Sequence, residues 1–481
     1  MAICIAACAA IAPQASAALI SQGGVRVGAD ALWSRGVLGQ GQTIAVVDKG
    51  FAGLDRSIAL GELPPRSEMT VQLFDPATGL DGSDEFGMPS VHGVRMAELI
   101  HDIAPDAHLV LVGYRTMDQF AQAAAWVAAQ GIPIATHSNS FLTPPFDGTG
   151  PAARAVDAAA AAGVLWVNSA GNFAERHWSG VAGPGVAIPI APGFGDPLLY
   201  SLAWTSPEVT ASVSVERQDP SGVWVEVQRS TPASPINAVT TPLVTTGGTW
   251  RVVVRQESGP PSQLDLFSRT VGFGAMAVAS GSIPTPGDAA GAVTVGAVKW
   301  TGTAIEPYSS NGRLGQGKPD LVAPTYVTSN PEWPGTAGTS ASTPHVAGVA
   351  ALLRQSRLAA GLPADAATLR GLLVATALDM GPAGPDPAFG AGMLRADTSA
   401  PLTRVRVGSG TTRVVRVQAK DAGTIRQVRI SLNGRSLRLV RRPAVGVRLP
   451  ALRRGANRLV VTAEDMAGNV GTRTLTLRGR R

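Results

Sequence analysis

The run QTIAVVD, residues 42–48, decides the fold of the first half of this chain. It is short, apolar and β-branched and it ends in an aspartate, which is typical of a buried parallel strand. Three similar runs follow: HLVLVG (108–113), IPIATHS (132–138) and VLWVNSAGN (164–172). Longer segments with helical periodicity separate them, so the sequence predicts an α/β fold, a parallel sheet with helices on both faces. Such sheets carry their sites at the carboxyl ends of the strands.

The helical segments of the first half are HGVRMAELIHDI (92–103), TMDQFAQAAAWVAAQG (116–131) and AARAVDAAAAAG (152–163). After residue 180 the alternation stops, and short strand-like pieces such as TWRVVVRQ (249–256) lie among Pro, Ser and Thr residues. We interpret this stretch as a β-sandwich inserted into the α/β domain. The α/β pattern resumes at AVTVGAVKW (292–300).

The length of 481 residues indicates two or three domains. We expect a signal peptide over residues 1–17 and then four segments. They are the first part of the α/β domain over 18–185, the inserted β-sandwich over 186–280, the second part of the α/β domain over 281–400, and a second, basic β-sandwich over 401–481.

The N-terminal run, MAICIAACAAIAPQASAAL, resembles the end of a secretory signal because small residues, Ala15-Ser16-Ala17, follow an apolar stretch. The alternative is an alanine-rich tail. Both cysteines, Cys4 and Cys8, lie in this run, so the rest of the sequence offers no disulfide or cysteine metal site. No run of 18 or more apolar residues predicts a membrane span. We therefore expect a secreted protein that acts as a monomer.

The net charge of +6 is the sum of a strongly basic C-terminal segment and an acidic remainder. Residues 401–481 hold 19 Lys and Arg against 3 Asp and Glu, whereas the remainder is acidic overall. In this segment arginines alternate with apolar residues, which predicts one core face and one positive face. Anionic envelope polymers are the partners expected for a secreted protein, nucleic acid is a further polyanion, and ordinary solvated charge remains the alternative.

Four polar residues occupy positions suited to acyl transfer. Asp48 ends a strand, His92 and Ser340 each open a helix, and Asn172 follows another strand. A serine becomes nucleophilic when an imidazole takes its proton and a carboxylate orients that imidazole, and an amide can donate to the oxyanion. Taken singly, Ser340 could be a helix N-cap, Asp48 and Asn172 turn residues, and His92 a surface histidine.

The stretches IAVVDKG (44–50), HGVRMAE (92–98), NSAGN (168–172) and GTSASTPHVAG (338–348) resemble the motifs of the subtilisin-like serine proteases, the subtilases. The order Asp, His, Ser along the chain is also the subtilisin order. This resemblance implies a subtilisin-like fold and a peptidase activity. It makes Asp48 the orienting carboxylate, His92 the general base, Ser340 the nucleophile and Asn172 the oxyanion donor.

The same resemblance predicts that Ser138, Asn139, Ser140 and Gly171 bind a peptide substrate as an added strand. Five motif positions depart from the family. Ser140 stands where a glycine usually edges the specificity pocket, and Ala341 where many subtilisins have a methionine. Lys49 replaces a small hydroxyl residue and is expected to point into solvent, while Arg95 and Glu98 replace a histidine and a glycine in the motif around His92. Neither of the last two positions is needed for proton transfer.

No cofactor is required for this chemistry. Subtilases often bind structural calcium, and DPATGLDGSDEFG (75–87) gathers Asp75, Asp81, Asp84 and Glu85, but their spacing matches no known calcium loop. The resemblance therefore allows a structural calcium ion, but no motif in the sequence supports a calcium site.

The two added β regions have weaker resemblances. The insert resembles the sandwich found beside many secreted peptidases, and the tail, with VVTAEDMAGNVGTRTLTL (460–477), resembles a bacterial Ig-like module. The sequence thus predicts a secreted serine endopeptidase acting on proteins or peptides through an acyl-enzyme. A subtilase scaffold that has lost activity and serves as a binding or adhesion protein is the alternative, and an esterase or peptide ligase would use the same intermediate.

Overall fold

The structure is a computed structural model in which residues 21–84, 87–231, 236–240, 244, 247–396, 401–408, 413–421, 424–465 and 469–479 are described. The expected signal peptide with Cys4 and Cys8, residue Glu85 of the acidic loop, and residues 397–400 at the junction with the tail lie outside the described residues.

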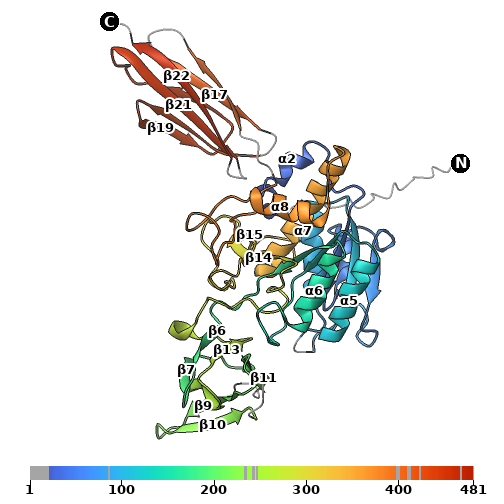
Figure 1. Cartoon of the computed structure of the whole chain (residues 1–481). Helices are drawn as coiled ribbons and strands as arrows, with labels where there is room; N and C mark the ends of the chain where they lie inside the picture. Colours follow the sequence, from blue (N-terminus) through green and yellow to red (C-terminus); the bar gives the residue numbers. More distant parts are fainter. Residues whose placement is uncertain are drawn as a thin grey trace, which may run out of the picture.

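A seven-stranded sheet forms the centre of the α/β part (Figure 1). Its strand order is β15–β14–β5–β4–β1–β3–β2, and every neighbouring pair is parallel, as the sequence predicts. The strands are β1 (Thr43–Asp48), β2 (Thr70–Leu73), β3 (His108–Gly113), β4 (Ile134–His137), β5 (Leu165–Ser169), β14 (Ala292–Lys299) and β15 (Leu321–Thr325).

Helices cover both faces of this sheet, which confirms the predicted α/β class. Along β1, Ile44 and Val46 pack into a core shared with α4 and α7, whereas Ala45 and Val47 pack into a core shared with α5 and α6. Burial on both sides explains why β1 reads as a continuous apolar run. The helices are α1 (Gln22–Arg26), α2 (Ala29–Trp33), α3 (Leu54–Leu60), α4 (His92–Ile103), α5 (Met117–Ala129), α6 (Pro151–Ala161), α7 (Thr339–Ala359) and α8 (Ala366–Ala375).

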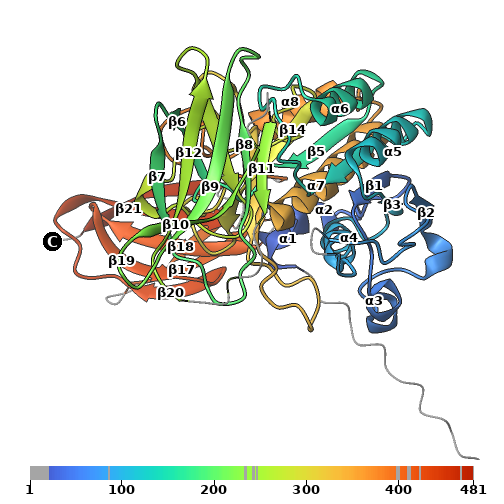
Figure 2. The same ribbon diagram turned by 90° about the horizontal axis from the view of Figure 1, so that it is seen from below.

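Two four-stranded antiparallel sheets lie between β5 and β14 in the chain and form the inserted sandwich (Figure 2). One sheet has the order β10–β9–β12–β7 and the other β11–β8–β13–β6, and both contribute to one apolar core. The strands are β6 (His177–Val181), β7 (Val186–Ile190), β8 (Leu199–Ala203), β9 (Thr210–Gln218), β10 (Trp224–Arg229), β11 (Ile236–Thr240), β12 (Trp250–Ser258) and β13 (Gln263–Ser268). Because β6 pairs with β13, the antiparallel pairing begins upstream of residue 186.

A second antiparallel sandwich follows the α/β part in the chain. In Figure 1 it lies at the end of the α/β part opposite the inserted sandwich. It consists of the sheets β16–β17–β20 and β19–β18–β21–β22. In β17, Val415 and Val417 are buried while Arg416 is exposed, so the predicted alternation of apolar and cationic faces is present. The strands are β16 (Leu402–Val407), β17 (Val414–Lys420), β18 (Ile425–Leu432), β19 (Arg435–Val440), β20 (Ala444–Arg448), β21 (Gly455–Asp465) and β22 (Val470–Gly479).

Within the described ranges, every helix is too short or too polar to cross a bilayer.

Helix α7 approaches α4 closely because Gly348 has no side chain. A Cβ atom built on Gly348 would lie 2.7 Å from Cβ of Ile103, closer than packed carbon atoms come. This contact keeps the first turn of α7, which carries Ser340, near the sheet and near α4. By contrast, Gly371 in α8 has no atom within 4 Å of such a Cβ.

We expect Gly348→Ala to lower the free energy of unfolding by about 1–3 kcal/mol, because overpacking outweighs the gain of about 1 kcal/mol in helix propensity. Gly371→Ala is the matched control, and it should raise the free energy of unfolding by about 0.5–1 kcal/mol. Urea unfolding of both variants measures the difference. Equal stabilisation by both substitutions would contradict the close packing of α4 and α7.

Candidate active site

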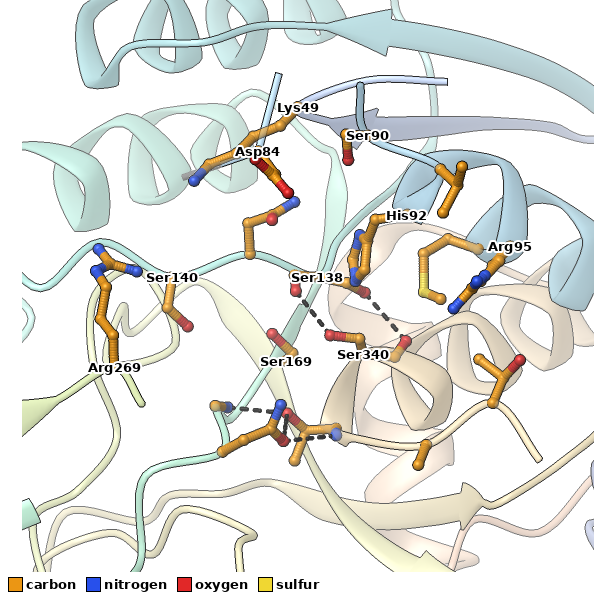
Figure 3. Close-up of a pocket in the computed structure, with 18 of the residues that line it drawn as sticks. Lys49, Asp84, Ser90, His92, Arg95, Ser138, Ser140, Ser169, Arg269 and Ser340 are labelled. Carbon is orange, nitrogen blue, oxygen red and sulfur yellow. Dashed lines mark hydrogen bonds between the residues drawn. The ribbon is translucent and has the colours of Figure 1, made fainter. Parts of the chain in front are cut away.

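The polar residues singled out in the sequence gather at one opening of the central sheet. A cavity of about 440 Å³ lies there, at the carboxyl ends of β4 and β5 and beside the first turns of α4 and α7 (Figure 3). His92, Asn172 and Ser340 line it, and so do the four expected substrate-binding residues, Ser138, Asn139, Ser140 and Gly171. Asp48 lies behind His92, at the end of β1.

Asp48 and His92 form a hydrogen-bonded pair in which only the carboxylate is buried. Nδ1 of His92 lies 2.7 Å from Oδ2 of Asp48, and the carboxylate is only 1% exposed while the imidazole is 32% exposed. The backbone N–H of Lys49 donates to the other carboxylate oxygen at 2.8 Å. Burial raises the pKa of Asp48, but the charge and hydrogen bond of His92 outweigh burial, so its pKa lies below the ordinary value. An ionised Asp48 holds the ring so that Nε2 is the nitrogen left for another partner.

Ser340 lies in the first turn of α7, against the segment that follows β4. Its hydroxyl donates to the carbonyl oxygen of Ser138 at 3.0 Å, and the hydroxyl of Ser138 donates back to the carbonyl oxygen of Ser340 at 3.2 Å (Figure 3). This reciprocal pair joins the start of α7 to the strand edge at residues 138–140, although the two segments lie far apart in the chain.

Asn172 is oriented by Thr339, a residue that the sequence reasoning did not single out. Its Oδ1 accepts from the backbone N–H of Thr339 at 2.9 Å and from the Thr339 hydroxyl at 3.1 Å. The same hydroxyl accepts from the N–H of Gly171 at 3.1 Å. Since Oδ1 is occupied, Nδ2 is the end of the amide that remains to donate. The signal in the sequence was only the position of Thr339 directly before Ser340.

The glycine before α7 is required by both conformation and space. Gly338 has φ of 100°, a left-handed value that other residues rarely adopt, and a Cβ there would lie 3.1 Å from Nδ2 of Asn172. Its N–H donates to the hydroxyl of Tyr308 at 3.1 Å. The chain therefore enters α7 at a fixed angle, without a side chain to displace Asn172.

Residues 262–392, which include Ser340, match the model of the subtilase family. The match covers the part of the α/β domain that runs from β14 through α8. No curated protein sequence matches the chain.

Among solved structures, the Clostridium perfringens CspB protease has the same fold, with a TM-score of 0.58 and 17% identity over 78% of this chain and 97% of that one. A lanthipeptide protease has a TM-score of 0.45 at 17% identity, covering 78% of this chain and 92% of that one. The prenylagaramide maturation protease PagA has a TM-score of 0.44 at 15% identity, covering 77% and 95%. The likeness to the first of these supports the subtilisin-like fold of the α/β part.

The residues that depart from the subtilase motif around His92 hold a loop of the domain beside the cavity. The guanidinium of Arg95 lies 4.4 Å from the ring centre of Trp333, a cation–π distance. Oε1 of Glu98 accepts from the Asn330 amide at 2.7 Å and from the Ser57 hydroxyl at 2.8 Å. Arg95 and Glu98 thus anchor the loop that leads to Gly338.

Lys49 was expected to point into solvent, but it does not project freely from the surface. Its side chain is half-buried and lines the cavity, where Figure 3 shows it beside Asp84. The turn after β1 is packed against the acidic loop, because a Cβ on Gly50 would lie 2.1 Å from the carbonyl oxygen of Asp81. This packing leaves the Lys49 side chain along the wall of the cavity.

No group of three or more His, Cys, Asp or Glu side chains in the described part of the chain is arranged to hold a metal ion. In the acidic loop, Asp75 accepts from the Thr78 hydroxyl at 2.6 Å, and Asp84 accepts from the N–H of Met88 at 2.9 Å. Both carboxylates thus accept hydrogen bonds from residues of their own turns.

A buried histidine lies beneath the site at the end of β4, and the sequence reasoning assigned it no role. Nδ1 of His137 lies 2.8 Å from Oδ1 of Asn168, and Nε2 lies 2.7 Å from the Tyr114 hydroxyl. The Asn168 amide nitrogen donates to the Ser169 carbonyl, so Oδ1 is the acceptor and His137 carries its proton on Nδ1. Complete burial lowers the pKa of His137 to about 4.

A second buried histidine, His345, lies in α7. Its Nδ1 donates to the Ala341 carbonyl at 2.8 Å, and Nε2 lies 3.4 Å from the Ser21 hydroxyl. Burial lowers the pKa of His345 to about 4 as well. This histidine joins the helix that carries Ser340 to the first described residue of the chain.

Acidification should destabilise the protein through these two histidines. Between pH 6.5 and about 4 the unfolded chain binds more protons than the folded one, so stability falls as pH falls through this window. In His345→Gln, the slope of unfolding free energy against pH should decrease by about 1.4 kcal/mol per pH unit. Urea unfolding at several pH values, with the exposed His108→Gln as control, measures this slope. An unchanged slope in His345→Gln would show that His345 is not held neutral.

Proposed function

We propose that the chain is a secreted serine endopeptidase that works as a monomer and cleaves proteins or peptides through an acyl-enzyme on Ser340. The observation that carries the proposal is the meeting of His92, Asn172 and Ser340 in one cavity, with Asp48 hydrogen-bonded behind the imidazole. The match of residues 262–392 to the subtilase family model supports the peptidase activity, and the N-terminal apolar run motivates secretion.

In the proposed reaction the hydroxyl of Ser340 turns from the Ser138 carbonyl toward Nε2 of His92. His92 takes the proton as Oγ attacks the substrate carbonyl, and ionised Asp48 stabilises the imidazolium through Nδ1. The imidazolium then gives its proton to the leaving amine, which departs and leaves an ester on Ser340. Water enters, loses a proton to His92 and attacks the ester. The imidazolium then returns this proton to Oγ of Ser340 as the acid product leaves.

The negative oxygen of each tetrahedral intermediate would accept hydrogen bonds from Nδ2 of Asn172 and from the backbone N–H of Ser340. Both donors lie beside the first turn of α7, whose unpaired N–H groups favour negative charge. Thr339 acts as a positioning residue because its N–H and hydroxyl hold Oδ1 of Asn172.

The substrate would lie along residues 138–140 and pair with their backbone as an added strand. Ser138, Asn139, Ser140 and Gly171 line the cavity on the two sides of such a strand. An extended peptide would then present the carbonyl to be attacked between Ser340 and Asn172.

A fluorophosphonate tests the activation of Ser340. We expect one adduct in the intact mass of the wild-type protein and none in Ser340→Ala, because only a serine deprotonated by a neighbouring base attacks phosphorus readily. Ser356→Ala removes a serine from the same helix outside the cavity and should label like wild type. Asn172→Ala should label roughly 100-fold more slowly, the loss typical of one oxyanion donor.

Absence of an adduct on folded wild-type protein would reject the proposal and favour the binding-scaffold alternative. An ester substrate cleaved in the absence of any peptide cleavage would instead favour an esterase that uses the same acyl-enzyme.

We further propose that the C-terminal sandwich binds anionic polymers through the outer face of its three-stranded sheet. Arg404 and Arg406 in β16 and Arg416 in β17 are exposed on this face, and Arg406 lies directly opposite Arg416. Like charges facing each other across strands are destabilising on their own. A polyanion would neutralise this pair and release its own counterions.

Heparin chromatography tests this surface. Arg406→Gln combined with Arg416→Gln should elute at clearly lower salt than wild type, because two cation–sulfate contacts are lost. The charge-matched control, Arg458→Gln with Arg473→Gln, removes two exposed arginines from the other sheet and should shift elution less. Equal shifts for the two double variants would show that retention follows net charge and not this face.

A further inference from the structure

The cavity beside Ser340 is strongly cationic. Four basic side chains line it, and among the described residues that do so only Asp84 is acidic. The basic residues are Lys49, Arg95, Arg176 and Arg269. Figure 3 shows Asp84 beside the Lys49 side chain, and Arg95 on the far side of His92 from Arg269. The end of the cavity near Ser140 therefore carries Arg269, which directly follows β13 of the inserted sandwich.

Arg176 and Arg269 lie where the insert joins the α/β domain. Arg176 precedes β6 and Arg269 follows β13, and these two strands pair through His177 and Phe267. The N–H of Ser268 donates to the Arg176 carbonyl at 2.8 Å, and the Arg176 guanidinium donates to the Arg269 carbonyl at 2.9 Å. The backbone of both residues is thus fixed by strand pairing, and both side chains are half-buried.

This arginine pair borders the space for one substrate side chain. Residues 138–140 line the cavity, and so do Ser169, Gly171 and Phe173. Figure 3 shows Arg269 opposite Ser140, with Ser169 between Ser140 and Ser340. If the attacked carbonyl lies at Ser340, the side chain of the residue before the cleaved bond extends along these serines toward Arg269.

We propose that this end of the cavity selects an acidic side chain, Glu or Asp, at the residue immediately before the cleaved bond, with Arg269 as the specificity-determining residue. The proposal rests on the proposed function, since it takes Ser340 as the point of attack. A guanidinium recognises a carboxylate through two parallel hydrogen bonds, and the Ser140 hydroxyl near Arg269 offers a further donor. The other cations of the cavity would attract acidic segments before they bind.

Two peptides that differ only in Glu or Gln before the cleaved bond test the proposal, because the two side chains have the same shape and differ in charge. We expect wild type to cleave the Glu peptide with kcat/KM at least about 10-fold higher than the Gln peptide. Arg269→Gln should lower kcat/KM for the Glu peptide about 10-fold and leave the Gln peptide within about twofold. This substitution keeps the Arg269 carbonyl, which Arg176 binds, so the fold at the junction is retained.

Arg217→Gln is the matched control, since it removes a cation from β9, in the other sheet of the same sandwich, where it does not line the cavity. It should leave the preference for Glu unchanged. Arg269→Lys keeps the charge and should retain part of the preference, and circular dichroism checks that each variant is folded.

Binding to Ser340→Ala protein, followed by fluorescence anisotropy of the same labelled peptides, tests recognition without catalysis. We expect the Glu peptide to bind about 10-fold more tightly than the Gln peptide, and the difference to disappear in Ser340→Ala with Arg269→Gln. Equal binding or cleavage of the two peptides would overturn the acidic preference, even if the fluorophosphonate labels Ser340. Preferential binding of the Glu peptide without any fluorophosphonate adduct on wild type would uphold the preference and reject the proposed hydrolysis.

Discussion

The site depends on a reversal of the strand order in the middle of the parallel sheet. The chain leaves β1 toward β2 on one side and leaves β4 toward β5 on the other, although β1 and β4 are neighbours. The carboxyl ends of these two strands therefore remain open, as at the switch points of other doubly wound sheets. Asp48 and Ser138 lie at this opening, and the helices α4 and α7 bring His92 and Ser340 to it from one face. Everything proposed about the chemistry uses this one crevice.

Much of the α/β part could be predicted from the sequence because burial on both faces makes its strands continuous apolar runs. The helix over residues 92–103 was predicted with its observed bounds, since its apolar periodicity begins and ends sharply. The sheet edges were harder to recognise. β2 is short and only partly buried. β15 contains Pro324, and a proline in the sequence argues against a strand, although a strand at the edge of a sheet tolerates it.

The residues of the candidate site were found through motifs, whereas their support was not. Thr339 orients Asn172 and His137 binds Tyr114, yet nothing in the spacing of these residues indicates either contact. Nothing in the sequence indicated the arginines at the wall of the cavity either. Their position follows from the pairing of β6 with β13, and a single sequence does not reveal which distant strands pair. Local patterns therefore singled out the residues that meet in the candidate site, but not the arginines that line the same cavity.

The pairing of β6 with β13 also bears on how the chain closes its central sheet. β5 and β14 are neighbours in that sheet, but the whole insert separates them along the chain. Once the sandwich has formed, its first and last strands lie side by side, so the ends of the insert are already close together. The loop that β5 and β14 must close is then effectively short, and each tenfold reduction in loop length saves about 2 kcal/mol of chain entropy. The insert thus lowers the entropic cost of joining the two halves of the α/β domain, and with it the cost of bringing α7, which carries Ser340, to α4, which carries His92.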